Sequence, residues 1–258
     1  MRVALDELTR EKGGGMASGE VVHGGVFLTL EGIDGCGKTT QVARLCDELA
    51  GRGLDVVSLR EPGGTPISEK VRALLLDPDN DEMSDECELL LYEAARAQLV
   101  RQVVEPALAA GSVVVCDRFF DSTFAYQAGG RGIDEDVVLR ANALGSCGVD
   151  PDVTILLDLD PDEAFARATA GGADRMEAAG LAFQRRVREG YRRVAELAPD
   201  RVRVVDATGT PDQVTSRILE ALEGELAALL GHDATCLNEG CADERRAGEK
   251  CDGGEGRG

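Results

Sequence analysis

The residues with the clearest chemical potential form a glycine-rich run early in the chain. Residues 32 to 39 fit the spacing G-x-x-x-x-G-K-[ST]. Glycines at this spacing let successive backbone N–H groups curl around phosphate oxygens, while the lysine reaches the β- and γ-phosphates and the final hydroxyl reaches Mg²⁺. The positive N-terminus of a following helix would point at the same phosphates. The residues predicted to bind ATP are Gly32, Ile33, Asp34, Gly35, Cys36, Gly37, Lys38, Thr39 and Thr40.

Further segments carry side chains suited to a second, small anionic substrate. An Arg-Glu-Pro-Gly-Gly-Thr stretch, 60 to 65, follows the second apolar run. Tyr92 and Arg96 are four residues apart, hence on one face of a helix. Asp117 and Arg118 directly follow the third apolar run, which places a carboxylate near a metal ion and a guanidinium near a phosphate. The polar stretch 121 to 132, DSTFAYQAGGRG, is read as a loop and helix turn that could touch a base and a sugar.

The first three of these segments also have an ordinary structural interpretation. The first could be a plain Pro-Gly turn, the second an amphipathic helix whose arginine extends to solvent, and the third a surface salt bridge. The glycine-rich loop itself is shared by kinases, ATPases and nucleotide-dependent switches. A switch would need an effector-responsive loop, whereas this chain offers arginines in positions suited to a second substrate.

Strand and helix patterns alternate around these segments. Short, β-branched, almost unbroken apolar runs are typical of strands buried on both faces of a parallel sheet. They occur at 26–30, 56–59, 113–116, 153–157 and 202–205. Helical periodicity or helix-start signals occur from residue 39 to about 50 and at 66–76, 86–102, 134–144, 161–168, 181–197 and 211–230. The pattern predicts an α/β fold of the P-loop NTPase class, with a five-stranded parallel sheet flanked by helices.

Composition limits the partners and the domain boundaries. The net charge of −20 disfavours nucleic acid and anionic membranes, and the apolar runs are too short to span a bilayer. We expect a flexible extension at 1–25 (Met16 being an alternative start), one domain at 26–230 and a disordered tail at 231–258. Eight cysteines fit a reduced cytoplasm. Cys236, Cys241 and Cys251 with His232 match no common zinc module, and His23 is expected to be inert.

Taken in order, these motifs resemble those of thymidylate kinases. The family pattern E-G-x-[DE]-G-x-G-K-T is matched at 31–39, and R-E-P-G-G-T at 60–65. An aromatic residue four before an arginine, followed by A-Q, occurs at 92–98. D-R-aromatic and S-T-x-A-Y-Q-x-G-G-R-G occur at 117–119 and 122–132, P-D-x-T at 151–154 and D-R-x-E at 174–177. The resemblance covers about residues 26 to 228, in register.

The resemblance implies roles for residues around a bound dTMP. Asp34 would hydrogen-bond the 3′-hydroxyl, Tyr92 would stack on thymine and Arg96 would bond a thymine carbonyl. Near the base and C2′ would lie Thr123, Gln127 and Tyr126, the last disfavouring ribose. Arg60 and Arg118 would hold the dTMP phosphate, and Asp117 would help Thr39 to position Mg²⁺.

The resemblance also implies a mobile lid near residues 168–178. Some thymidylate kinases carry a catalytic arginine in the P-loop, where this chain has Gly35, and others carry it in the lid. We therefore expect the bacterial type with a lid arginine, Arg175 first and Arg167 second. Arg175 could instead form a structural ion pair with Asp174 or Glu177. The predicted catalytic residues are Lys38, Asp117, Arg118 and Arg175.

The expected reaction is transfer of a phosphoryl group from ATP to dTMP, with Mg²⁺, by a cytoplasmic homodimer. No nucleic-acid or membrane partner is expected. A kinase for another pyrimidine monophosphate and a nucleotide-dependent P-loop switch are the alternatives.

Overall fold

A parallel sheet forms the centre of the structure. The computed structural model describes residues 24–168 and 180–230. Its five strands are arranged in the order β2-β3-β1-β4-β5, all parallel. They are β1 (Val26–Glu31), β2 (Val56–Arg60), β3 (Val113–Asp117), β4 (Val153–Asp158) and β5 (Val202–Asp206). The predicted fold class and each predicted strand are confirmed.

Each strand runs one residue beyond its apolar run, and that last residue is charged. These residues are Glu31, Arg60, Asp117, Asp158 and Asp206. Because the strands are parallel, their carboxyl ends share one edge of the sheet, where ligands of open α/β sheets bind. In the register, Asp117 is paired with Leu30 of β1 and with Arg60 of β2. The sheet therefore gathers charged groups from distant parts of the chain around the end of β1.

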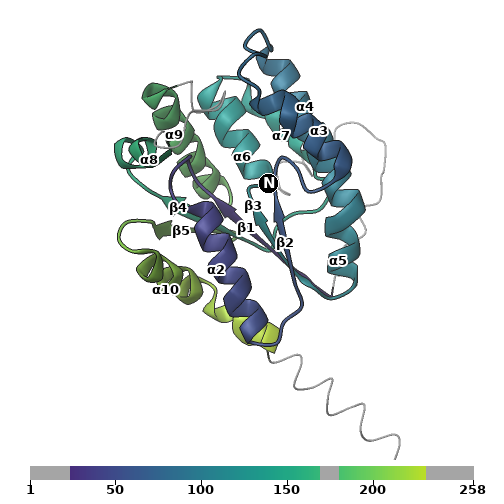
Figure 1. Ribbon diagram of the computed structural model, residues 1–258, viewed down its shortest axis with the longest axis vertical. Helices are drawn as coiled ribbons and strands as arrows, with labels where there is room; N and C mark the ends of the chain where they lie inside the picture. The colour runs from purple at the N-terminus through teal and green to yellow at the C-terminus, as the bar shows by residue number, and fades with distance from the viewer. Residues whose placement is uncertain (1–23, 169–179, 231–258) are drawn as a thin grey trace, which may run out of the picture. The chain divides into compact units, whose positions relative to one another are not determined.

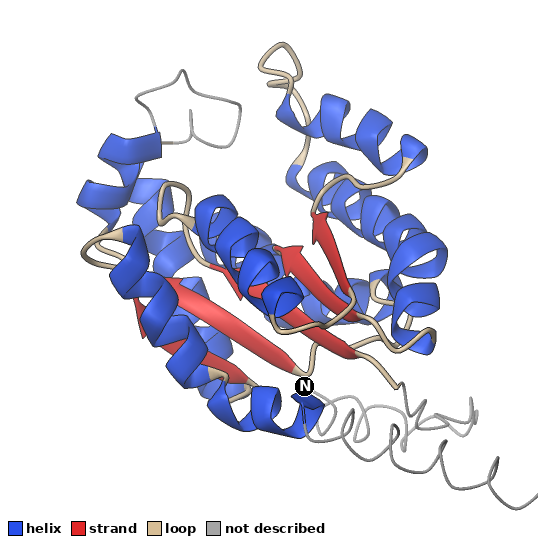
Figure 2. Ribbon diagram, turned by 60° about the horizontal axis from the view of Figure 1, so that its bottom comes forward, coloured by secondary structure: helices blue, strands red, loops and turns tan. Residues whose placement is uncertain are grey.

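Helices pack on the sheet, and Figure 1 shows α2 (Lys38–Gly51) crossing in front of it. Figure 2 shows the strands lying between helices. The others are α3 (Pro66–Leu76), α4 (Asp85–Leu99), η1 (Val100–Val104), α5 (Glu105–Ala109), α6 (Phe120–Thr123), η2 (Phe124–Gly130), α7 (Glu135–Gly145), α8 (Pro161–Ala168), α9 (Leu181–Leu197) and α10 (Pro211–Ala221). The bounds of α3, α8 and α9 are those predicted.

Local sequence explains where several helices begin. The Thr65 hydroxyl accepts from the backbone N–H of Ser68 at 3.1 Å, and Pro66 occupies the first turn of α3. The Ser84 hydroxyl caps α4 in the same way, at 3.2 Å from the Cys87 nitrogen. Side-chain caps of this kind satisfy backbone donors that have no partner within the helix. These caps hold the two helices that border the predicted second-substrate site.

Two helical segments have π-helical hydrogen bonding, which periodicity did not predict. The segment predicted as a helix over 86–102 runs on through η1 and α5 to Ala109. The stretch read as a polar loop and helix turn, 121–132, is mostly helical, with η2 covering Phe124–Gly130. Single π-helical turns are frequent at functional sites, since the extra residue shifts side chains around the helix.

The packing of η2 against α9 depends on small residues. A Cβ on Gly190 of α9 would lie 2.8 Å from the Cα of Ala125 and 2.9 Å from its carbonyl oxygen. A Cβ on Gly129 would lie 3.0 Å from the Cα of Gly190. Both contacts are with backbone, so neither can be relieved by rotating a side chain. The closeness of the two helices places side chains from both in the site described below.

We expect Gly190→Ala to lower the free energy of unfolding by roughly 1–3 kcal/mol, since the methyl group would force α9 away from η2. Urea unfolding followed by circular dichroism measures this. Gly51→Ala is the matched control: Gly51 also lies in a helix, nothing lies within 4 Å of its Cβ position, and alanine there should be neutral or stabilising. Equal midpoints for Gly190→Ala and wild type would contradict the packing argument.

An aliphatic and aromatic cluster holds the α4–η1–α5 segment to the sheet. It includes Leu99, Val104 and Leu108 from the helices and Phe27 and Val114 from the strands. Phe27 and Phe119 meet edge to face, with ring centroids 4.9 Å apart. Phe119 follows Arg118, so the end of β3 and its charged residues are anchored in this core.

The chain divides into two compact units, 1–218 and 219–258. The second is described from 219 to 230 and is helical over most of that length. Residues 1–23, most of the predicted extension, and the tail with its three cysteines and His232 lie outside the described residues, as does His23. Within 24–168 and 180–230, no helix has the length and apolar character that a membrane span requires, and no cluster of three His, Cys, Asp or Glu side chains could hold a metal ion.

Candidate active site

The phosphate loop lies between the end of β1 and the start of α2. Gly32, Gly35 and Gly37 have φ angles of 140°, 82° and 98°, which side chains other than glycine rarely adopt. A Cβ on Gly32 would also lie 2.6 Å from the carbonyl oxygen of Leu157. No side chain caps α2, whose N-cap residue is Gly37. No side chain therefore occupies the backbone N–H groups at this helix end, which can donate to phosphate oxygens instead.

Lys38 lies across the loop to which it belongs. Its Nζ donates to the carbonyl oxygen of Ile33 at 2.9 Å and lies 3.8 Å from Cys36 Sγ. The residue is 6% exposed, so the ammonium is held close to the loop and not extended into solvent. A cation fixed there can neutralise phosphate charge without first paying for reorganisation.

Thr39 and Asp117 bring two oxygen atoms together at the edge of the sheet. The Thr39 hydroxyl donates to Asp117 Oδ2 at 2.8 Å. One comes from the first turn of α2 and the other from the end of β3. A hydroxyl and one carboxylate are the donor set with which Mg²⁺ is commonly held next to substrate phosphates.

Arg118 is the centre of a polar cluster at the end of β3. Its φ is 77°, an uncommon conformation for arginine. The guanidinium forms an ion pair with Asp34 of the phosphate loop and donates to the Gly32 carbonyl oxygen at 3.2 Å. It also donates to the hydroxyls of Ser122 and Tyr191, each at 3.1 Å. A backbone conformation of this kind persists only where the surroundings fix it.

Asp34 is bonded from three directions. Besides Arg118, it accepts from the Tyr126 hydroxyl at 2.7 Å and from Gln184 Nε2 at 3.0 Å, both to Oδ2. Burial alone would raise the pKa of Asp34, but Arg118, Lys38 and these hydrogen bonds hold it below its usual value. Asp34 is therefore a carboxylate near neutral pH. Gln184 was not among the predicted site residues, and its position after the lid segment gave no sign of this contact.

Glu31, the last residue of β1, fixes the backbone around Arg118. Its Oε1 accepts from the backbone N–H of Phe119 at 2.6 Å and of Ser122 at 3.3 Å. Its Oε2 accepts from the hydroxyls of Ser122 at 2.6 Å and Tyr191 at 3.0 Å. The carboxyl thus holds both the residue after Arg118 and two groups that its guanidinium contacts. Burial is the main cause that raises the pKa of Glu31 to about 7, and the charge of Asp121 is the second.

This raised pKa gives stability a pH dependence with a definite sign. The folded state binds the Glu31 proton more tightly than the unfolded state, so the resulting stabilisation is complete below the unfolded pKa of 4.5 and is lost as pH rises through about 7. The shift corresponds to a loss of about 3 kcal/mol over that window. We expect wild type to lose that much more unfolding free energy than Glu31→Gln between pH 5 and pH 8, measured by urea unfolding. Parallel pH profiles for the two proteins would be the contrary result.

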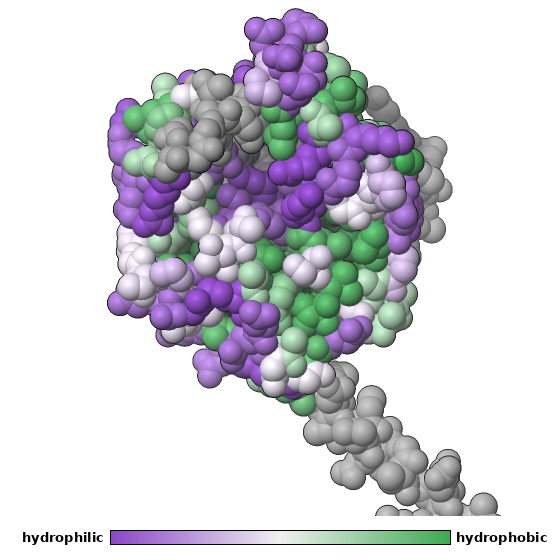
Figure 3. Space-filling model, viewed as in Figure 1, coloured by the Kyte–Doolittle hydropathy of each residue, from purple (hydrophilic) through white to green (hydrophobic). Residues whose placement is uncertain are grey.

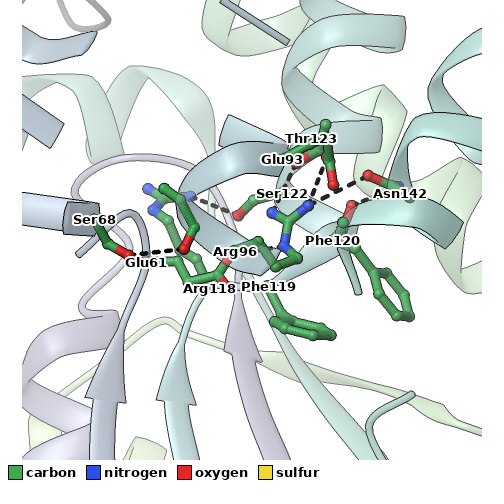
Figure 4. A network of polar contacts seen from close by, with 12 residues as sticks. Glu61, Ser68, Glu93, Arg96, Arg118, Phe119, Phe120, Ser122, Thr123 and Asn142 are labelled. Carbon is green, nitrogen blue, oxygen red and sulfur yellow. Dashed lines mark hydrogen bonds and ion pairs between the residues drawn. The ribbon is translucent and has the colours of Figure 1, made fainter. Parts of the chain in front are cut away.

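A second buried cluster surrounds Arg96 of α4, as Figure 4 shows. Its guanidinium donates to Glu61 at 2.8 Å, Glu93 at 2.6 Å and the Thr123 hydroxyl at 2.8 Å. Two carboxyls share one guanidinium, and Oε1 of Glu61 and Oε2 of Glu93 have no hydrogen-bond partner in the described structure. Burial is the main cause that raises the pKa of Glu61 to about 7, against the opposing effect of Arg96. Near neutral pH this cluster can hold a proton.

One cavity brings most of the predicted substrate residues together. Seven of the eight predicted substrate-binding residues line it: Asp34, Tyr92, Arg96, Arg118, Thr123, Tyr126 and Gln127. They come from the phosphate loop, α4, the end of β3, α6 and η2. Figure 3 shows hydrophilic residues gathered over the upper half of the face that Figure 1 presents.

Arg60, the eighth, lies outside the cavity. It is half exposed and pairs with Glu69 at 3.1 Å. Arg72 of α3 lines the cavity instead and donates to the Pro62 carbonyl oxygen at 2.9 Å. Also missed were Glu61, Pro62, Leu76 and Ser122. Glu61 and Pro62 stood in the quoted Arg-Glu-Pro motif, so they could have been singled out, whereas Arg72 had only helical spacing to mark it.

The two candidate lid arginines differ in what the structure describes. Arg175 and nearly all of the predicted lid, 168–178, lie outside the described residues. Arg167 lies in the last turn of α8, is about two-fifths exposed and pairs with Glu163 one turn earlier in the helix. An exposed pair of this type contributes little to stability and leaves the side chain able to exchange partners.

Comparisons with known proteins agree on one family. A family model described as thymidylate kinase matches residues 30–218. A thymidylate kinase of Desulfosudis oleivorans is 48% identical over 206 residues, covering 77% of this chain and 96% of that protein. One from Chlorobaculum tepidum is 45% identical over 208 residues, covering 77% and 97%. The crystal structure of thymidylate kinase from Ehrlichia chaffeensis is similar at a TM-score of 0.65 and 33% identity, covering 77% of this chain and 98% of that one. On sequence, fold and site together, this chain belongs to the thymidylate kinase family.

Proposed function

We propose that this chain transfers the γ-phosphoryl group of ATP to dTMP, giving ADP and dTDP. The observation that carries the proposal is the ion pair between Asp34 and Arg118. Asp34 belongs to the phosphate loop, yet it lines the cavity that holds the predicted acceptor residues. Donor and acceptor sites therefore share a wall, which is the geometry that direct transfer between two bound nucleotides requires.

On the donor side, the loop N–H groups and Lys38 would bind the ATP phosphates. Thr39 and Asp117 would hold Mg²⁺, which would neutralise phosphate charge when bound; their adjacent oxygens support this assignment. Phosphoryl transfer depends mostly on positioning and on charge neutralisation. Lys38, fixed on its own loop, supplies a positive charge at the position where charge moves.

On the acceptor side, Arg118 would bind the dTMP phosphate and Asp34 the 3′-hydroxyl. The ring of Tyr126, whose hydroxyl contacts Asp34, would lie near C2′ and disfavour ribose. Tyr92 would stack on the base, with Arg96, Thr123 and Gln127 at its edge. Only the resemblance supports Arg60 as a ligand of the dTMP phosphate, because its guanidinium pairs with Glu69 in this structure. Arg175 is likewise proposed as the lid arginine from the resemblance.

The same resemblance supports a homodimer. Eight cysteines support a cytoplasmic location, and composition supports the domain limits 26–230. An acidic chain of net charge −20 fits small-molecule substrates better than a nucleic acid. Size-exclusion chromatography with light scattering tests the dimer directly.

A coupled assay of ADP release over a panel of monophosphates tests the proposed reaction. We expect turnover with dTMP to exceed turnover with dUMP, dCMP and ribothymidine monophosphate. Without an acceptor, we expect almost no ADP release. A preference for another monophosphate would replace dTMP as the substrate. Nucleotide hydrolysis that no acceptor accelerates would instead identify a P-loop switch.

A further inference from the structure

Gln127, at the cavity wall, is bonded to a buried carboxylate that has no place in the proposed transfer. Its Nε2 donates to Glu88 Oε1 at 2.8 Å, and both side chains are about 1% exposed. Arg131 donates to the same carboxylate through Nε at 3.1 Å and NH2 at 2.9 Å. Glu88 lies in the first turn of α4, whereas Gln127 lies in η2 and Arg131 directly follows it.

The chemistry of this contact fixes the orientation of the Gln127 amide. Arg131 donates to both oxygens of Glu88. A guanidinium that contacts both oxygens of a carboxylate stabilises its ionised form, which can only accept hydrogen bonds. It can therefore face the amide nitrogen of Gln127 but not the amide oxygen, which must lie on the other side of the amide carbon. An amide flip would place two acceptors against each other in a buried site, which costs more than a lost hydrogen bond.

The residues around Glu88 hold it in place. The Arg131 guanidinium lies over the Phe183 ring, 5.0 Å from its centroid, and the Arg131 backbone N–H donates to the Tyr126 carbonyl oxygen at 2.9 Å. Asp85, one turn before Glu88, lies 3.4 Å from Arg131 Nε. The carboxylate is thus supported independently of Gln127, so Glu88 determines the amide orientation and not the reverse.

We propose that Glu88 keeps the amide oxygen of Gln127 available to the cavity, and that this orientation selects a base with a ring N–H donor over one with a ring-nitrogen acceptor. The inference rests on the proposed function. Thymine and uracil present N3–H between two carbonyl groups, whereas cytosine presents a bare N3 beside an amino group. An amide oxygen accepts from N3–H and repels the cytosine N3. A site built to pair with a substrate hydrogen bond rejects the analogue that lacks it. Glu88 is thus a positioning residue for specificity.

Glu88→Gln tests the proposal, because its amide can donate to the Gln127 oxygen and permit the flip. We expect KM for dTMP to rise about tenfold with kcat nearly unchanged, and the ratio of kcat/KM for dTMP over dCMP to fall about tenfold or more. Asp85→Asn is the matched control, since it removes a half-exposed carboxylate from Arg131 without touching Gln127. Its ratio should equal that of wild type.

A double-mutant cycle separates orientation from packing. In Gln127→Leu, which has no amide to orient, adding Glu88→Gln should leave the dTMP over dCMP ratio unchanged. An unchanged ratio in folded Glu88→Gln, or an equal fall with and without the Gln127 amide, would overturn the proposal. If Glu88→Gln does not fold, Glu88→Asp replaces it. Aspartate keeps the charge beside Arg131, but its shorter side chain no longer reaches Gln127. A dTMP over dCMP ratio equal to that of wild type would then overturn the proposal.

Failure of the proposed function would look different. Wild type would then show no dTMP phosphorylation at all. Calorimetry would still test the orientation of the Gln127 amide, because binding of dTMP and dCMP can be measured without turnover. If Glu88→Gln preferred dTMP over dCMP as strongly as wild type does, the proposal would be overturned. Loss of that preference in the variant would support the proposal.

Discussion

Replacing Lys38 with alanine should lower kcat by roughly three orders of magnitude, the effect expected when one preorganised charge is removed from a transition state. The Lys38 ammonium is 2.9 Å from the Ile33 carbonyl oxygen, so its position is set by the loop that would bind the phosphates. Alanine is a good helix former, and Lys38 begins α2, so the helix should form as before. The measurement is steady-state ADP release, with circular dichroism and thermal unfolding to check the fold.

Lys70→Ala is the control for this variant. Lys70 is an exposed lysine of α3 and is not among the residues that line the cavity. Its replacement removes the same charge from the protein and should leave kcat unchanged. Turnover by folded Lys38→Ala within about tenfold of wild type would refute the assignment of the loop, given the size of the expected effect.

Arg118→Ala should reduce kcat/KM for dTMP by about a hundredfold or more, mainly by raising KM. The change removes the guanidinium proposed to bind the acceptor phosphate. It also leaves Asp34 without its ion-pair partner beside Tyr126, so the free energy of unfolding should fall by about 1–3 kcal/mol. Arg118→Lys keeps the charge but lacks the planar fork that reaches Gly32, Ser122 and Tyr191 together, and should recover only part of the loss.

Arg101→Ala is the matched control, since Arg101 is mostly exposed and pairs with Glu105 one turn away on the same helical segment. Its replacement should change neither kcat nor KM, because exposed pairs contribute little. If Arg118→Ala binds dTMP as wild type does in calorimetry, the acceptor phosphate lies elsewhere, and Arg72 in the same cavity becomes the residue to test.

The sequence predicted well those features that depend on short stretches of neighbouring residues. The loop at 32–39 is defined by glycine spacing, and its φ angles and the helix start follow from those residues alone. The strands were predicted because β-branched runs buried on both faces have few alternatives. The predicted strands ended one residue too early, because the last residue of each strand is charged and does not continue the apolar pattern.

What the sequence did not predict depends on contacts between distant residues. Arg60 and Arg72 are twelve positions apart and chemically identical, but only the packing of α3 against α4 places Arg72 in the cavity wall. The partners of Arg96 include Glu61, thirty-five positions earlier, so its burial between carboxyls could not be read from helical spacing. The π-helical turns of η2 likewise fit closely against Gly190, more than fifty residues later.

The position of Asp34 in the phosphate loop has a consequence for how the two substrates affect each other. Any displacement of that loop by ATP phosphates would move a side chain that Arg118, Tyr126 and Gln184 all contact. The affinity of each nucleotide would then depend on whether the other is bound, and by linkage the factor must be the same in both directions. Because a single carboxylate would be common to both proposed sites, substitutions that tune the affinity for one substrate would alter the affinity for the other, and the two specificities would have had to evolve together.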